Sequence, residues 1–256
     1  MIIAVDIGNS SISIGYFSSQ GLMVQKIPTH PLRSPFEYRK MMRDFVQENN
    51  IENGRVAGII SSVVSGHTEP LKEALEGISE TGREALVVVS HELAGIGYRI
   101  PHPEELGTDR IANAVAAFSL VRRPVIAVDF GTATTISVVD SEGNYRGGSI
   151  LPGIGLMNEA LGMKTSRLRK VDLAPPGKSL GSDTAGCILS GLFIGTAGAV
   201  ERIISEIEGE TGVSYDVVLT GGFSRMMDSF IRRPHTVSAD LTLEGLKILY
   251  ERNRPQ

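Results

Sequence analysis

The stretch Ile2-Ile3-Ala4-Val5-Asp6-Ile7-Gly8 occurs twice in this chain with small changes. The second copy, Val125-Ile126-Ala127-Val128-Asp129-Phe130-Gly131, starts 123 residues later and is identical at five of seven positions. In each copy an apolar strand carries an aspartate near its end, and a glycine then turns the chain. The offset is nearly half of the 256 residues. The repeat therefore indicates two related domains rather than a solenoid, whose periods run about 20–50 residues.

The likeness continues beyond the glycine. Ser19-Gln20-Gly21 in the first copy corresponds to Ser141-Glu142-Gly143 in the second, so each copy predicts three successive strands joined by tight turns. Helical and strand-like segments then alternate in both halves. We therefore predict an α/β protein with domains 1–120 and 121–256. The predicted helices cover residues 36–47, 110–121, 183–208 and 242–251, and the strand-like runs cover residues 55–64, 85–90 and 216–220.

The composition is that of an ordinary globular protein, with 41% hydrophobic and 21% charged residues. A net charge of −4 argues against non-specific binding to nucleic acid, and the absence of tryptophan disfavours base-stacking surfaces. The single cysteine, Cys187, excludes an internal disulfide and a thiolate-rich zinc site, and we expect it inside the core. It also suits a reducing compartment, so we expect a cytoplasmic protein.

No membrane partner is expected from the sequence. Residues 1–16 lack the basic region of a signal peptide and already carry Asp6. The longest uncharged run, residues 184–200, is 17 residues long and holds four glycines, which is at the short limit for a membrane-spanning helix. We predict a buried helix there.

Each repeat combines the features of a phosphate-binding turn. Gly8 and Gly131 allow backbone amides to approach an anion closely. Short polar side chains follow each glycine. An aspartate stands beside each turn, and Mg²⁺ keeps several waters while taking only one or two carboxylates. The two turns together would suit a nucleoside triphosphate and its metal ion. The donors after the first glycine are Asn9, Ser10 and Ser11, and those after the second are Thr132, Thr134 and Thr135.

Three other segments resemble phosphate-binding motifs but lack residues that those motifs require. Gly177-Lys178-Ser179 ends like a P-loop, but Asp172 stands where that motif needs glycine, and two prolines precede it. Gly153-Ile154-Gly155 and Gly95-Ile96-Gly97 lack the third glycine of a dinucleotide-binding turn. The chain must therefore handle phosphate without a P-loop lysine, and bound cations would supply most of the positive charge.

Together with Leu219-Thr220-Gly221-Gly222, the repeated turns resemble those of the superfamily of acetate and sugar kinases, heat-shock ATPases and actin. More narrowly, the chain resembles the type III pantothenate kinases along essentially its whole length. This resemblance implies two duplicated ribonuclease H-like domains, each a mixed five-stranded sheet with flanking helices. The motifs that carry it are residues 6–10, 107–110, 129–135, 147–153, 181–184 and 190–191.

The resemblance implies ATP-dependent phosphorylation of pantothenate to 4'-phosphopantothenate, the first step of coenzyme A biosynthesis. It implies that Asp109 accepts the hydroxyl proton, that Gly107, Thr108, Asp109 and Arg110 line the pantothenate site, and that Thr184 contacts pantothenate from the other half. Taken alone, Asp109 is also a favoured N-cap residue for the helix that follows. Two alternatives stay open, another small-molecule kinase of this superfamily and a non-catalytic nucleotide-binding regulator.

The same resemblance implies the positions of the cofactors. Asp6 would lie near Mg²⁺ through water, and Asp129 would hold a monovalent cation, K⁺ or NH₄⁺. Gly221 and Gly222 would lie on the adenosine side of ATP. The residues implied at the ATP phosphates are Gly8, Asn9, Ser10, Ser11, Gly131 and Thr132.

The family also forms homodimers. Gly191, Gly195 and Gly198 share one face of the predicted helix 183–208, where small residues allow a close approach of another helix. Packing within one subunit is the alternative use of that face. The chain departs from the family pattern at two positions, with Ile100 in place of a tyrosine and Ser137 in place of an acidic residue. We assign no substrate contact to the nearby Tyr98.

Overall fold

The computed structural model describes residues 1–51, 56–64, 66–78, 86–93, 95–164 and 168–254. The first positions of the predicted strand-like runs 55–64 and 85–90 lie outside the described residues. The chain forms two compact units. The first comprises Met1–Ile96, Pro101–Ala116 and Thr242–Gln256, and the second comprises Gly97–Ile100 and Ala117–Leu241.

The sheet of the first unit has five strands in the order β3-β2-β1-β4-β5. The first three strands form an antiparallel meander, and β4 and β5 continue the sheet in parallel with β1. The central strand β1 is an apolar run because both faces of the sheet are covered. The strands are β1 (Ile2–Ile7), β2 (Ser11–Ser18), β3 (Gly21–Pro28), β4 (Ala57–Ser62) and β5 (Leu86–Val88).

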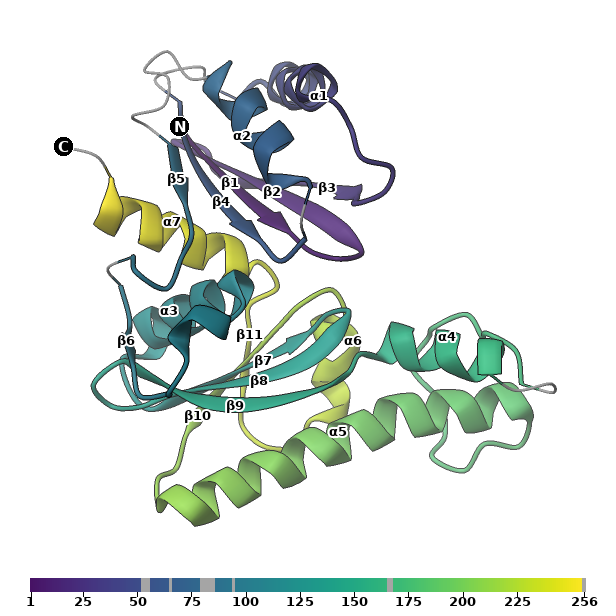
Figure 1. Ribbon diagram of the computed structural model, residues 1–256. Coiled ribbons are helices and arrows are strands. Elements are labelled where there is room, and N and C mark those ends of the chain that lie inside the picture. The colour runs from purple at the N-terminus through teal and green to yellow at the C-terminus, as the bar shows by residue number, and fades with distance from the viewer. Residues whose placement is uncertain (52–55, 65, 79–85, 94, 165–167, 255–256) are drawn as a thin grey trace. The chain divides into compact units, whose positions relative to one another are not determined.

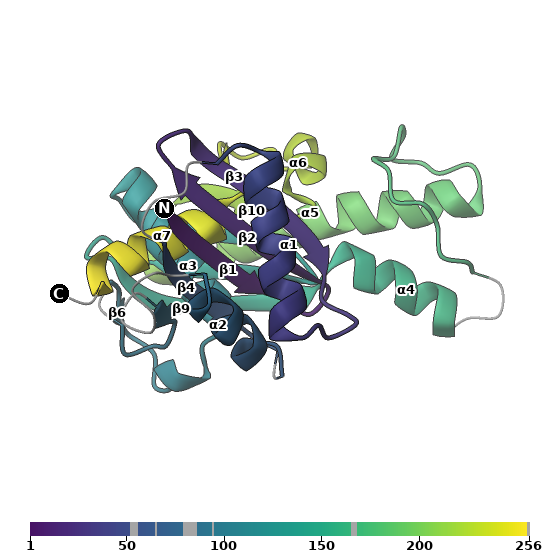
Figure 2. The ribbon, with the colours of Figure 1, turned by 90° about the horizontal axis from the view of Figure 1, so that it is seen from above.

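Helices α1 (Pro35–Glu48) and α2 (Thr68–Glu76) cover one face of this sheet (Figures 1 and 2). α1 begins at a capping box, in which Ser34 accepts the backbone N–H of Glu37 and the Glu37 carboxylate accepts that of Ser34. α2 approaches β4 so closely that a Cβ on Gly58 would lie 3.2 Å from the Leu75 side chain. The buried core on this face includes Ile3, Val5, Ile7, Tyr38, Met42 and Leu71.

Helix α7 (Leu241–Asn253) packs on the other face of the same sheet (Figure 1). A Cβ on Gly15 of β2 would lie 3.1 Å from the Leu243 side chain, and Leu246 is fully buried. The sequence pattern placed this helix in the second domain, whereas it belongs to the first unit. The reason is physical, since a terminal helix docks wherever its apolar side chains find a complementary face, and sequence distance does not fix that choice.

The sheet of the second unit has six strands in the order β11-β10-β7-β8-β9-β6. Five of them repeat the order and directions of the first sheet, which explains the repeat in the sequence. The sixth, β6 (Gly97–Tyr98), pairs in parallel with β9 and extends the predicted five-stranded sheet by one short edge strand. The others are β7 (Val125–Phe130), β8 (Ala133–Val139), β9 (Asn144–Pro152), β10 (Asp216–Thr220) and β11 (Thr236–Val237).

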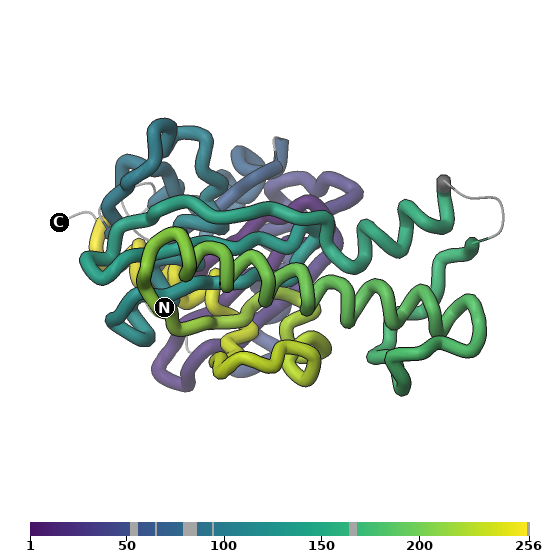
Figure 3. The backbone as a smooth tube through the Cα atoms, turned by 90° about the horizontal axis from the view of Figure 1, so that it is seen from below, coloured from purple at the N-terminus to yellow at the C-terminus, as the bar shows by residue number. Residues whose placement is uncertain are grey.

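The long helix α5 (Thr184–Thr211) packs on one face of this second sheet (Figure 3). Asp183 caps its start by accepting the N–H of Gly186 at 2.7 Å, and Gly212 ends it in a left-handed conformation. By length and composition α5 could cross a membrane. Phe193 and Val200 are fully buried in the core of this unit, whereas Gly191, Gly195 and Gly198 are exposed, so the predicted burial holds for one face of the helix only.

Shorter helical segments complete the two units. α4 (Ile154–Lys164) lies beside the first half of α5 (Figures 1 and 3). α3 (Thr108–Val121) starts in the first unit and ends in the second. The remaining segments are α6 (Ser224–Met227) and the 3₁₀ turns Pro103–Glu105 and Asp228–Phe230.

Both aspartates of the repeat lie in equivalent positions of their sheets. Asp6 is paired with Ser61 on parallel β4, and Asp129 is paired with Thr220 on parallel β10. Residues paired in register point to the same face of a sheet. The duplication therefore places a hydroxyl residue beside each carboxylate, at the same end of each sheet.

The docking of α7 gives a stability prediction. Gly245→Ala is expected to lower the free energy of unfolding by about 1–3 kcal/mol, because the added methyl would overlap the Ala112 carbonyl of α3. The matched control is Gly209→Ala in α5, where a Cβ meets nothing within 4 Å. That change should stabilise the protein by up to about 1 kcal/mol, the helix propensity difference. Urea denaturation of both variants measures the effect, and stabilisation by Gly245→Ala would contradict the packing.

Candidate functional site

The turn after β1 is held by hydrogen bonds on its inner side. The Gly8 N–H donates to the Ser11 carbonyl at 3.1 Å, which closes the turn. Thr29, a fully buried residue just after β3, donates from Oγ1 to the Gly8 carbonyl at 2.6 Å and from its N–H to the Ser10 carbonyl at 3.3 Å. Asn9 and Ser10 are exposed at the tip. Thr29 thus fixes the conformation of the turn, although no motif in the sequence marked it.

The carboxylate of Asp6 lies beside two hydroxyl groups. Ser61 is fully buried, and its Oγ donates to Asp6 Oδ1 at 3.1 Å. The same Ser61 Oγ lies 2.9 Å from Thr108 Oγ1, at the start of α3. Thr108 Oγ1 also accepts the Ser62 N–H at 3.0 Å. The structure therefore brings Asp6 and the 107–110 motif together, through a serine that sequence reasoning missed.

The 107–110 motif forms the first turn of α3. The N–H groups of Arg110 and Ile111 donate to the Gly107 carbonyl at 3.1 and 3.2 Å. Asp109 Oδ1 accepts the Arg110 N–H at 2.8 Å and folds over Gly107, where a Cβ would lie only 2.6 Å away. Glycine at position 107 therefore leaves the room that this carboxylate occupies.

Asp109 is electrostatically distinct from an ordinary surface aspartate. Burial raises the pKa of its carboxyl group, and this outweighs the opposing effects of the Arg110 N–H and the Arg110 charge. A higher pKa makes the ionised carboxylate a stronger proton acceptor. The N-cap interpretation of Asp109 is wrong, because α3 begins at Thr108 and Asp109 lies inside its first turn.

The turn after β7 depends on close backbone approach. The Gly131 N–H donates to the Ala133 carbonyl at 3.1 Å. The end of β9 returns to the same turn, where the Gly153 N–H donates to the Thr132 carbonyl at 3.0 Å. A Cβ on Gly153 would overlap the carbonyl groups of Gly131 and Thr132. The glycine at the end of the 147–153 motif is therefore a packing requirement of this second turn.

A second glycine encloses Asp129 from the side of β10. Gly221 has a φ of 91°, and a Cβ there would overlap Asp129 Oδ1 and the backbone of Phe130. The turn is fixed by two further bonds, from the Phe223 N–H to the Phe130 carbonyl at 3.1 Å and from Ser224 Oγ to the Gly221 carbonyl at 2.7 Å. The second unit thus gathers Asp129, the 131–132 turn and the 221–222 turn at one end of its sheet.

Thr184 lies apart from that group in the second unit. It is exposed at the start of α5 and lines a cavity of about 550 Å³ between α4 and α5. The lining is mostly apolar and includes Leu161, Ile188 and Leu192. Cys187 is exposed in the same cavity, so the expectation of a core cysteine is wrong. Its side chain lines that cavity, where the thiol lies 3.5 Å from the Gly181 carbonyl.

The described residues hold no group of three or more His, Cys, Asp or Glu side chains that could bind a metal. Asp6 and Asp129 each offer one carboxylate, and Gly131 and Gly221 of the two turns lie close to that of Asp129. Carboxylate and carbonyl oxygens are the donors that hard cations take in proteins. The residues fit ions that receive their remaining ligands from water and phosphate oxygens.

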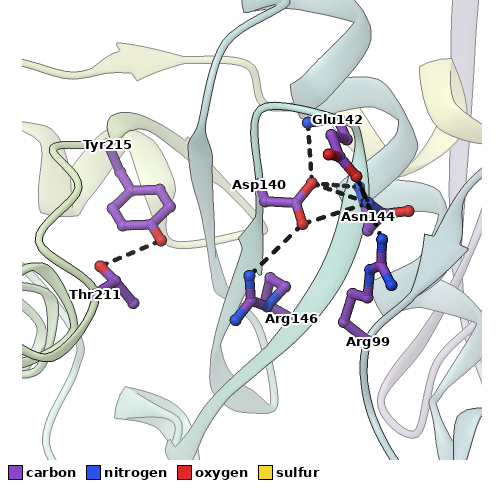
Figure 4. Close-up of polar contacts among 7 residues, drawn as sticks. All are labelled: Arg99, Asp140, Glu142, Asn144, Arg146, Thr211 and Tyr215. Carbon is purple, nitrogen blue, oxygen red and sulfur yellow. Dashed lines mark hydrogen bonds and ion pairs between the residues drawn. The ribbon is translucent and has the colours of Figure 1, made fainter.

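The same unit has a second cavity, of about 560 Å³, with a polar lining. The charged side chains of this lining pair with one another (Figure 4). Asp140 accepts the N–H groups of Glu142 and Asn144 at 3.0 and 2.9 Å, and Arg146 approaches it at 3.7 Å. Burial raises the pKa of Asp140, but these N–H groups outweigh it and leave the pKa below its usual value. Arg99 pairs with Glu142 at 3.4 Å. The cluster stabilises the β8–β9 turn and leaves no net positive charge for an anion.

The two departures from the family pattern lie in ordinary surroundings. Ser137 is buried in β8 and is paired with Ala127 and Gly148. Ile100 follows β6, close to Gly147. Tyr98 is in β6 with its hydroxyl buried, and burial raises the pKa of this phenol to about 12.

Comparison with known proteins matches residues 2–206 to the family model for type III pantothenate kinase. The chain is 34% identical to the type III pantothenate kinase of Moorella thermoacetica over 255 residues, which cover 99% of this chain and 100% of that protein. It is 36% identical to that of Dehalococcoides mccartyi, covering 99% and 96%.

The chain belongs to the type III pantothenate kinase family.

Solved structures support the fold of this type III pantothenate kinase family member. A putative Baf family transcriptional activator from Campylobacter jejuni superposes with a TM-score of 0.59 at 18% identity, covering 98% of both chains. A putative 2-dehydro-3-deoxygalactonokinase from Sinorhizobium meliloti superposes with a TM-score of 0.57 at 13% identity, covering 98% of this chain and 97% of that one. At these identities the likeness shows the fold alone. The predicted fold class, that of the sugar kinases and actin-like ATPases, is confirmed.

The packing around Asp129 gives a second prediction. Gly221→Ala is expected to lower the free energy of unfolding by more than Gly212→Ala. Both glycines have positive φ, 91° and 65°, and alanine at either costs about 1–2 kcal/mol for that reason alone. Only at Gly221 would the methyl also overlap a carboxylate and a backbone segment, since a Cβ on Gly212 meets nothing within 4 Å. If urea denaturation shows equal losses of unfolding free energy for the two variants, the close approach of Gly221 to Asp129 and Phe130 is contradicted.

Proposed function

We propose that this chain transfers the γ-phosphoryl group of ATP to the primary hydroxyl of pantothenate, with Asp109 as the proton acceptor. Membership of the type III pantothenate kinase family supports the reaction, which is the first step of coenzyme A biosynthesis. The assignment of Asp109 rests on its environment. Its carboxyl group has a raised pKa and lies at the start of α3. The motif that contains it is joined to Asp6 by hydrogen bonds through Ser61.

Phosphoryl transfer asks an enzyme mainly for positioning, for charge stabilisation and for a group that accepts the hydroxyl proton. In our proposal the Asp109 carboxylate takes that proton as the hydroxyl oxygen bonds to the γ-phosphorus, and the bond to the β-phosphate oxygen breaks to release ADP. Arg110 can bind the pantothenate carboxylate through two parallel hydrogen bonds. Gly107 and Thr108 line the same acceptor site.

The two turns are proposed to bind ATP. Backbone and hydroxyl donors of Asn9, Ser10, Ser11 and Thr132 would bind the phosphates, and Gly8 and Gly131, whose own N–H groups close the turns, would let the phosphates approach. Gly221 and Gly222 would lie on the adenosine side. The support is that each turn is a short, glycine-dependent backbone loop beside a carboxylate, which is a suitable cradle for an anion and its counterion.

Two ions complete the proposed site. Asp6 would hold Mg²⁺ through water, and Asp129 would hold a monovalent cation, K⁺ or NH₄⁺. When bound, these ions neutralise the charge of the phosphates in the transition state. The chain's own contribution is to position each carboxylate, Asp6 through the Ser61 hydroxyl and Asp129 through the close approach of Gly131 and Gly221.

We further propose a cytoplasmic homodimer. The small-residue face of α5 is consistent with it, because Gly191, Gly195 and Gly198 are exposed and a Cβ on each meets nothing within 4 Å among the described residues. That excludes tight packing of this face inside the described chain. Thr184 lies on the same helix and would contribute to a pantothenate site. Sedimentation of the purified protein as a monomer would overturn the dimer.

The first test of this function is Asp109→Asn. We expect turnover to fall by about 10²–10⁴-fold, the usual contribution of a proton acceptor, while ATP binding stays intact. The same loss should appear in wild-type enzyme as pH falls through the raised pKa of Asp109. The control is Asp44→Asn, which removes an exposed carboxylate paired with Lys40 and should keep full activity. Coupled-assay rates and ATP titration measure both effects, and full activity of Asp109→Asn would reassign the base.

The second test concerns substrate and cation. Purified protein with ATP, Mg²⁺ and pantothenate is expected to form phosphopantothenate in potassium or ammonium buffer and much less in sodium buffer, because Asp129 would hold the larger cation. Product is measured by mass spectrometry. Sugars and other hydroxy acids serve as alternative acceptors. If no phosphopantothenate appears in potassium, the reaction is wrong. If another acceptor is preferred, the chain is a kinase of different specificity.

A further inference from the structure

A continuous line of side-chain hydrogen bonds in the first unit joins Asp6 to the proposed acceptor motif, residues 107–110. It starts at Asp6 on β1, passes through the Ser61 hydroxyl on β4 and ends at the Thr108 hydroxyl on α3. The two steps measure 3.1 and 2.9 Å. Ser61 is fully buried, so water does not compete for these bonds. The three residues are far apart in the sequence and are joined only by the fold.

The hydrogen bonds around this line hold both hydroxyl groups in place. An ionised carboxylate only accepts hydrogen bonds, so the single Ser61 hydrogen goes to Asp6 Oδ1. Thr108 Oγ1 accepts the Ser62 N–H at 3.0 Å and has two acceptors within reach of its own hydrogen, Ser61 Oγ at 2.9 Å and the Ser62 carbonyl at 3.2 Å. Thr108 is therefore held against the end of β4, beside the hydroxyl that donates to Asp6.

The equivalent hydroxyl residue of the second unit has a different partner. Thr220 is paired with Asp129 as Ser61 is paired with Asp6, but Thr220 Oγ1 donates to the Ala239 carbonyl at 3.5 Å. The duplicated sheet alone therefore does not explain the line through Ser61. What distinguishes the first unit is that α3 begins beside its hydroxyl residue and carries Asp109 in its first turn.

We propose that Ser61 is a positioning residue, which holds the acceptor motif at a fixed place relative to Asp6 through the hydroxyl of Thr108. This inference rests on the proposed function of Asp109 and Asp6. Asp109 is adjacent to Thr108, so a shift of Thr108 moves the proton acceptor. Small displacements matter here, since a misplacement of about 1 Å can cost roughly 10²-fold in rate.

The experiment compares variants that remove the hydrogen bond with variants that keep it. Ser61→Ala and Thr108→Val delete one hydroxyl each, and Thr108→Val keeps the side-chain shape. Each is expected to lower kcat for pantothenate phosphorylation by about tenfold or more, with a much smaller change in the KM for ATP. Thr108→Ser keeps the hydroxyl and should retain most of the activity. The double variant Ser61→Ala with Thr108→Val should be little worse than the weaker single variant.

The matched control is Ser18→Ala, which removes a hydroxyl at the end of neighbouring β2 that accepts the Gln20 N–H. It should leave kcat unchanged. Thermal unfolding of each variant separates positioning from folding, because a purely structural serine would lower the melting temperature and leave kcat of the folded enzyme intact.

Normal kcat for Ser61→Ala, additive losses in the double variant, or better activity in Thr108→Val than in Thr108→Ser would each overturn the proposal while leaving the kinase function standing. An inactive wild-type protein would instead overturn the proposed function, and the role of Ser61 with it.

Discussion

Two aspartates sit near the ends of buried central strands, and the pairing register of those strands determines their surroundings. Asp6 and Asp129 lie on β1 and β7, whose other residues are almost entirely apolar. A carboxylate at such a place is costly unless polar groups surround it. The parallel neighbour supplies one for Asp6, because Ser61 is paired with it and donates a hydrogen bond to it, and Thr220 is paired with Asp129 in the same register. A slip of one residue would turn each carboxylate to the other face and remove its partner.

From this common arrangement the two units are completed in different ways. In the first unit, side-chain hydroxyl groups join the carboxylate to the start of α3, where Asp109 lies. In the second unit, glycines at positions 153 and 221 let backbone segments close around Asp129 and the turn after it. In our proposal the hydroxyl groups of the first unit position the proton acceptor, and the glycines of the second unit shape the site of the monovalent cation.

The proposed mechanism follows from the missing P-loop motif in the sequence. Without a P-loop lysine, charge on the phosphates has to be met by ions, by backbone N–H groups and by hydroxyl groups. Such groups act only when they are held rigidly. This explains why so much of the structure around the turns serves to fix backbone, including Thr29 behind the first turn and Gly153 against the second.

The sequence by itself determined the duplication, the three successive strands that open each half, the four helices α1, α3, α5 and α7 and the motif of Asp109, because these depend on local periodicity and on turn residues. Only the tertiary structure decided that Ser61 joins Asp6 to Thr108, that Thr29 supports the first turn, that Gly153 is a packing requirement and that β6 extends the second sheet. It also decided that α7 packs in the first unit and that Cys187 is exposed. These features arise between segments far apart in the chain. A hydroxyl or a glycine acquires its role from what the fold places beside it, and no local pattern records that neighbour.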